Sequence, residues 1–145
     1  MNYKKKAENT IILNGNSEKD NIVIYIYKED IEDEMDEEIL FSEAFNKLND
    51  NEEFNIIKYT ENIWFGINPN CSTCIYIDFN DEEIDVKNAI KLVDSKRWKL
   101  KAGFMYVENN YSKIIITSSK SPSSMFVKNN KWSELTKNFK IHQLK

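Results

Sequence analysis

The chain has 145 residues, 41% of them hydrophobic, and a formal net charge of −4, which fits one globular domain spanning 1–145 and excludes a disordered acidic polymer. No apolar run reaches the roughly 18 residues that cross a bilayer. Ile11-Ile12-Leu13 is also too short for the core of a secretory signal, so we expect a cytoplasmic protein without a membrane partner. The net charge hides a division, because residues 1–85 hold 7 Lys/Arg against 21 Asp/Glu and residues 86–145 hold 13 against 3. Such asymmetry indicates a charged partner on at least one side.

The first elements are two predicted strands and a helix. Thr10–Leu13 is a short strand candidate, and Asn21–Tyr27 is a continuous β-branched and aromatic run. Such a run is typical of a strand that is buried on both faces. From Glu37 onward, apolar residues recur with helical spacing, which predicts one apolar stripe facing the core. The stripe consists of Leu40, Phe41, Ala44, Phe45 and Leu48.

Three strand candidates follow at Phe54–Tyr59, Ile63–Ile67 and Cys74–Phe79. Their connections are short and turn-like, which predicts antiparallel pairing of sequential neighbours. A second amphipathic helix is predicted from about Glu82 to Asp94, because its apolar residues again follow helical spacing.

The last third alternates polar and apolar residues. Trp98–Glu108 is predicted as a single amphipathic strand, with Asn109-Asn110 as a turn into a strand at Lys113–Thr117. Weaker signals predict a short strand at Met125–Val127, a helical turn near Ser133–Asn138 and an extended tail at Phe139–Leu144. The element order with short loops favours an α+β fold: a mainly antiparallel sheet of about 5–7 strands with two main helices packed on one face.

Several catalytic motifs are incomplete. Cys71 and Cys74 form a C-x-x-C, but Cys74 enters a strand, so no helix N-terminus lowers its pKa. His142 is the single histidine, without the partners of a catalytic relay, and no glycine-rich phosphate loop is present. Calcium loops beginning at Asp30 or Asp78 lack the required glycine. We therefore expect no catalytic residues, no bound metal and no cofactor.

A magnesium-dependent nuclease remains as an alternative. Asp78 ends a predicted strand, and Asp94-Ser95-Lys96 forms a D-x-K triplet. Two carboxylates would hold the metal and the lysine would polarise water. Such triplets arise often by chance in a chain with 30% charged residues.

The acidic tract Glu29–Glu38 has two interpretations. It is either a solvated loop and helix start or a docking surface for a basic protein. The second predicts an inhibitor or an immunity-type antitoxin that blocks a cationic toxin such as a nuclease. The predicted partner-binding residues are Glu32, Asp33, Glu34, Asp36, Glu37 and Glu38, extended by Asp81, Glu82 and Glu83.

The basic part offers another alternative, which is nucleic-acid binding. Lysines would contact phosphates while Trp98 stacks on a base. The predicted contact residues are Lys96, Arg97, Lys99 and Lys101. A further interpretation of the charge division involves no partner. The basic part would then lie against the acidic part inside one fold.

Overall fold

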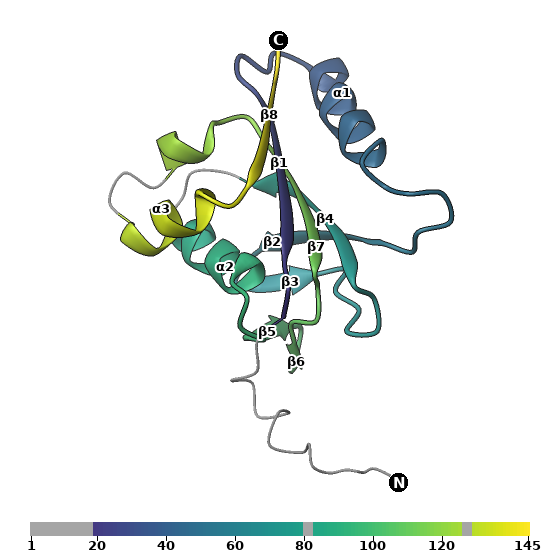
Figure 1. The fold of residues 1–145 in the computed structure, drawn as a ribbon, viewed down its shortest axis with the longest axis vertical. Coiled ribbons are helices and arrows are strands. Elements are labelled where there is room, and N and C mark those ends of the chain that lie inside the picture. Colours follow the sequence, from purple (N-terminus) through teal and green to yellow (C-terminus); the bar gives the residue numbers. More distant parts are fainter. Residues whose placement is uncertain (1–18, 80–82, 126–128) are drawn as a thin grey trace, which may run out of the picture.

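A computed structural model describes residues 19–79, 83–125 and 129–145 of the chain (Figure 1). The predicted strand at Thr10–Leu13 and most of the one at Met125–Val127 lie outside these residues. Six strands form one sheet in the order β3-β2-β4-β7-β1-β8, and β5 and β6 form a separate hairpin. The strands of the sheet are β1 (Ile22–Lys28), β2 (Asn55–Thr60), β3 (Ile63–Phe65), β4 (Thr73–Phe79), β7 (Lys113–Ser118) and β8 (Lys140–Leu144).

Three α-helices connect these strands. They are α1 (Glu34–Phe45), α2 (Glu83–Val93) and α3 (Asn130–Thr136), and a short 3₁₀ helix occupies Pro122–Met125. None of the helices in the described part of the chain is sufficiently long and apolar to cross a membrane.

The prediction of a mainly antiparallel sheet is wrong, because the sheet is mostly parallel. Strand β1 pairs in parallel with β7 and β8, and β4 pairs in parallel with β2 and β7. Among these six strands, the antiparallel pair is β2–β3, which a tight turn joins. Strand β4 then returns to the other side of β2 instead of pairing with β3. Helix α2 and the β5–β6 hairpin lie in the connection between the parallel neighbours β4 and β7, whereas β3 and a loop lie in the connection between β2 and β4.

The helices cover both faces of the sheet, so the expectation of helices on one face is also wrong. Leu40 and Ala44 of α1 pack on one face against Ile24, Ile26 and Ile115. On the other face, α2 and α3 pack against the alternate residues of the same strands, including Val23, Tyr25, Ile114 and Ile116. Figure 1 shows α1 on one side of β1, with α2 and α3 on the opposite side. The continuous apolar composition of β1 follows from this double cover.

An aromatic cluster fixes α3 on the sheet. The Trp132 ring lies 5.5 Å from both the Phe79 ring and the Phe139 ring, measured between centroids. Its indole Nε1 donates a hydrogen bond to the carbonyl oxygen of Pro122 at 3.1 Å. Because α3 has only seven residues, this buried ring is the main attachment of the helix to the core.

The predicted single strand Trp98–Glu108 is a hairpin. Strand β5 (Lys99–Ala102) ends at a two-residue turn, and β6 (Met105–Glu108) runs back beside it. Gly103 occupies the first central position of the turn with φ +68°, which suits a type II′ hairpin turn. The turn places Tyr106 opposite Lys101, so these two side chains share a face that the unbroken strand would have divided between them.

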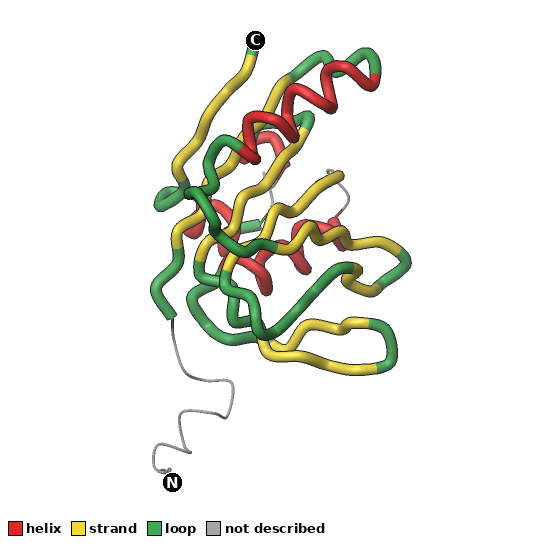
Figure 2. The backbone as a smooth tube through the Cα atoms, turned by 90° about the vertical axis from the view of Figure 1, so that its right-hand side faces the viewer, coloured by secondary structure: helices red, strands yellow, loops and turns green. Residues whose placement is uncertain are grey.

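The parallel arrangement brings the carboxyl ends of β1, β4 and β7 to one edge of the sheet. From this edge the chain leaves β1 toward α1 on one face and leaves β7 toward α3 on the other. Crevices between strands whose crossovers diverge in this way are the usual ligand sites of open parallel sheets. Figures 1 and 2 show the β5–β6 hairpin at the end of the molecule remote from α1, so the acidic tract and this basic segment lie far apart.

Candidate functional site

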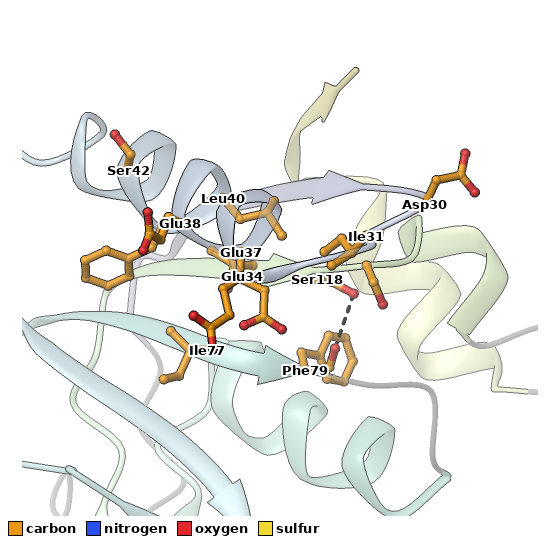
Figure 3. Close-up of a pocket in the computed structure, with 13 residues that line it drawn as sticks. Asp30, Ile31, Glu34, Glu37, Glu38, Leu40, Ser42, Ile77, Phe79 and Ser118 are labelled. Carbon is orange, nitrogen blue, oxygen red and sulfur yellow. Dashed lines mark hydrogen bonds between the residues drawn. The ribbon is translucent and has the colours of Figure 1, made fainter.

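A pocket of about 920 Å³ lies between α1 and the carboxyl ends of β1, β4 and β7. We call it the carboxyl-edge pocket. Its apolar lining comes from Leu40 and Phe41 of α1 and from Ile77 and Phe79 of β4. Figure 3 shows Ile77 and Phe79 beneath the first turns of α1. The pocket therefore occupies the place where the topology of the sheet predicts a ligand.

Carboxylates surround this apolar lining. Asp30, Glu34, Glu37 and Glu38 all line the pocket, so four members of the acidic tract meet there. In Figure 3 the side chains of Glu34 and Glu37 point from α1 toward the end of β4, whereas Asp30 points away from the centre. The helical spacing of residues 34, 37 and 38 places these three glutamates on neighbouring positions of one helix surface.

The tract folds in this way because two of its members make local bonds. Asp33 is the N-cap of α1, and its Oδ1 accepts a hydrogen bond from the backbone N–H of Asp36 at 3.1 Å. Asp36 in turn accepts a bond from the backbone N–H of Glu32 at 3.0 Å and lies 3.3 Å from the Lys28 ammonium. The bond from Glu32 and the contact with Lys28 lower the pKa of Asp36. Helix α1 consequently begins at Glu34 rather than at the predicted Glu37.

Replacing Asp33 by alanine is expected to lower the free energy of unfolding by about 1 kcal/mol, because N-cap removal leaves a helix donor unpaired. Chemical denaturation of the variant beside Asp33→Asn, which keeps a capping oxygen, measures this contribution. An equal loss in both variants would mean that the charge, rather than the cap, stabilises α1.

The remaining acidic residues of the tract face solvent without neutralisation. Glu32, Glu34, Glu37 and Glu38 are exposed, and none of them pairs with a cation within residues 19–79, 83–125 and 129–145. Asp33 and Asp36 thus act in the fold of the tract, while these four glutamates, together with the exposed Glu29 and Asp30, carry its outward charge. Among the described residues, the internal neutralisation by the basic part does not occur at these four side chains.

Three further predicted residues lie beyond β4. Asp81 and Glu82 are outside the described residues, and Glu83 is the first residue of α2. Helix α2 covers the face of the sheet opposite to α1, and its first residue follows the carboxyl end of β4 by four positions.

Sequence reasoning missed the residues at the strand ends. The backbones of Phe79 and Ser118 are paired across β4 and β7, and Ser118 Oγ donates a hydrogen bond to the Phe79 carbonyl oxygen at 3.3 Å (Figure 3). Ser118 Oγ also accepts a bond from the backbone N–H of Lys120 at 3.1 Å. These bonds hold the wall of the pocket. The signal that would have found Ser118 is its place among the polar residues that follow the apolar run Ile114–Ile116, whereas Phe79 carries no such signal.

The structure does not assemble the alternative nuclease site. Asp78 lies next to the carboxyl end of β4, whereas Asp94 follows the end of α2 at the opposite edge of the sheet. Asp94 is buried and accepts a hydrogen bond from Trp98 Nε1 at 3.0 Å. Lys131 also lies 3.9 Å from its carboxylate. These contacts give Asp94 a structural role beside the basic segment.

The cysteines and the histidine are likewise dispersed. Cys71 and Cys74 are free and buried, and burial raises the pKa of the Cys74 thiol well above its ordinary value. His142 is exposed on the edge strand β8. Within the part of the chain that the structure describes, no three potential metal ligands gather in one place.

A second pocket of about 470 Å³ lies at the amino edge of the sheet beside Lys19. The Lys19 ammonium donates hydrogen bonds to Asn21 Oδ1 at 2.8 Å and to the carbonyl oxygens of Asp94 and Tyr111. Burial lowers the pKa of Lys19 to about 8. This cation satisfies a carbonyl group just after α2 and another between β6 and β7, so it serves the fold, and the carboxyl-edge pocket remains the stronger candidate site.

Comparison with known proteins adds no relative. No protein-family model matches the chain, and no curated protein has a significantly similar sequence.

Proposed function

We propose that the protein is a binding module that captures a basic protein at the carboxyl-edge pocket. The observation that carries this proposal is the gathering of Glu34, Glu37 and Glu38 around an apolar-lined pocket without neutralisation by described cations. Uncompensated like charges on one helix surface destabilise a monomer, and a cationic partner relieves that repulsion.

The pocket suits the side chain of a lysine or arginine. The methylene stem of such a residue packs on apolar surface while its charged end remains among polar groups. Here Ile77 and Phe41, both half-buried, provide the apolar surface, and Glu34 and Glu37 provide the acceptors (Figure 3). A guanidinium would form paired, charge-assisted hydrogen bonds with these carboxylates.

An inhibitor or immunity-type antitoxin is the concrete form of this proposal. A nuclease binds the phosphates of its substrate with cationic residues, and a row of carboxylates offers the same charge pattern. An acidic helix placed over such a site would exclude the nucleic acid. Charge complementarity of this type accelerates association, and salt screens the acceleration.

The experiment measures association with an arginine-rich peptide and with a basic ribonuclease, at low and at physiological salt. The test variant is Glu34→Gln/Glu37→Gln/Glu38→Gln, and the control is Asp50→Asn/Glu53→Gln/Glu61→Gln, which removes the same charge from exposed residues elsewhere. We expect the pocket variant to associate about tenfold more slowly or worse, with a flatter salt dependence, and the control to change little.

Measuring ribonuclease activity in the same titrations tests whether the protein acts as an inhibitor. Inhibition that the pocket variant loses and the control retains would support occlusion of the nuclease. Equal losses of inhibition in both variants would show that net charge alone causes the effect. Undiminished binding by the pocket variant would refute the site.

A further inference from the structure

We propose that the hairpin at the end remote from the pocket binds single-stranded nucleic acid. This surface, which we call the basic hairpin, comprises residues 96–108 and includes β5 and β6. It shares no residue with the carboxyl-edge pocket, so the two proposals stand or fall separately.

Large apolar side chains at the hairpin tip have no role in the core. Phe104 is completely exposed, and Met105 and Tyr106 expose 66% and 63% of their surface. By contrast, Leu100, on the face of the hairpin opposite to Tyr106, is 1% exposed and packs in the core. A fully exposed phenylalanine in a tight turn stabilises nothing within the monomer, so these rings are available for a ligand.

Lysines lie beside aromatic rings on the basic hairpin. Lys101 is directly opposite Tyr106 in the hairpin register, which places their Cβ atoms about 5 Å apart. Lys96 lies 5.7 Å from the centroid of the Trp98 ring, which is 38% exposed. Lys99 is exposed one step further from the tip, opposite Glu108. A single strand presents both phosphates and bases, so it can contact these ammonium groups and aromatic rings together.

One of the predicted contact residues is placed differently. Arg97 is half-buried, and its Nε is fully buried in the described structure. The contact surface therefore consists of Lys96, Lys99 and Lys101 with Trp98, Phe104 and Tyr106.

A single strand fits this surface better than a duplex does. Exposed rings bind the faces of unstacked bases, which a duplex hides, and sequence-independent binding requires no arginine to recognise base edges. A membrane surface is the competing occupant, because an apolar tip with lysines behind it also suits an anionic bilayer. The position of Lys101 opposite Tyr106 favours nucleic acid, because this lysine lies beside an aromatic ring. A membrane-binding tip would have its lysines behind all of the apolar side chains.

The experiment titrates fluorescent single-stranded DNA and RNA, and a duplex of the same sequence, by anisotropy with the full chain. Trp98 fluorescence gives an independent signal, because Trp64 and Trp132 are buried. We expect salt-sensitive binding of the single strand, with a slope of log affinity against log salt of about −2 for three lysine contacts. The duplex is expected to bind at least tenfold more weakly.

Variants separate charge from stacking. Phe104→Ser and Tyr106→Ser are each expected to lower affinity by roughly 5-fold to 100-fold with an unchanged salt slope. Lys99→Gln/Lys101→Gln should reduce the slope by about 1.4. The matched control is Lys137→Gln/Lys140→Gln, which removes two exposed lysines elsewhere and should leave both quantities unchanged.

Three results would overturn the inference. They are equal effects of the control and the hairpin lysines, equal affinity for the duplex, or binding to phosphatidylserine vesicles that exceeds binding to the oligonucleotides and depends on Phe104. Failure in any of these ways leaves the carboxyl-edge pocket untouched, because the arginine-rich peptide and the ribonuclease test it through different residues.

Discussion

Trp132→Ala is expected to lower the free energy of unfolding by about 3–5 kcal/mol, the usual cost of emptying a buried tryptophan site. Trp132 has no exposed surface and lies between the rings of Phe79 and Phe139. The substitution also leaves the Pro122 carbonyl oxygen without its indole donor. Because α3 is short and leads directly into β8, loss of this anchor should release the C-terminal segment from the sheet.

Chemical denaturation followed by circular dichroism measures the loss. Trp132→Phe is the matched variant, because it keeps an aromatic ring against Phe79 and removes the hydrogen bond, and it should lose about 1–2 kcal/mol. Hydrogen exchange of β8 amides should accelerate in the alanine variant more than exchange in β4. A loss below about 1 kcal/mol for Trp132→Ala would show that the cluster closes around the missing ring.

Gly66→Ala is expected to cost about 2–4 kcal/mol, which combines a left-handed alanine with a steric clash. Gly66 has φ +86° just after β3, and an added Cβ would lie 2.1 Å from the carbonyl oxygen of Ile56. That oxygen belongs to the backbone of β2, so no side-chain movement relieves the contact. The β2–β3 turn or the pairing of the two strands must distort.

Gly103→Ala provides the control for this prediction. Gly103 also has a positive φ, of +68°, but a Cβ added there would meet no heavy atom within 4 Å. The strain is therefore shared by both variants and the clash belongs to Gly66 alone, so Gly103→Ala should lose only about 1 kcal/mol. Equal melting temperatures for the two variants would mean that the edge strand β3 shifts to accommodate the methyl group.

Local patterns in the sequence located most elements of the fold. The strand predicted at Asn21–Tyr27 is β1, at Ile22–Lys28, and the helix predicted from about Glu82 to Asp94 is α2, at Glu83–Val93. The predicted apolar stripe of the first helix is confirmed at Leu40 and Ala44, but Phe45 is half-exposed. Local periodicity records which residues are apolar, and it does not record which of them meet another element.

The direction of the strands was misjudged because short connections outweighed composition. The continuous apolar runs at residues 22–26 and 114–116 belong to strands that are covered on both faces. Such double cover is typical of parallel sheets. The sequence order of the strands conceals that β1 lies between β7 and β8. Such long-range pairing depends on tertiary packing that no short window of sequence contains.

The candidate site was likewise only partly predictable from the sequence. The acidic tract was evident from eight carboxylates in ten residues, yet the sequence did not distinguish the N-cap Asp33 from the outward-facing Glu34. The apolar lining from Ile77 and Phe79 was hidden, because it depends on β4 ending beside α1. Likewise, the pairing of Lys101 with Tyr106 required the turn at Gly103, which the alternating pattern had concealed.

The place of β1 in the sheet has a consequence for biosynthesis. Its neighbours are β7 and β8, whose pairing residues begin at Lys113 and Lys140, so the isoleucine-rich β1 stays unpaired until these later segments leave the ribosome. At ordinary translation speeds that delay is roughly 5–20 s. During this interval β1 is an apolar segment without its pairing strands. Chaperone supply should therefore influence the yield of native protein more than it does for a domain built from local hairpins.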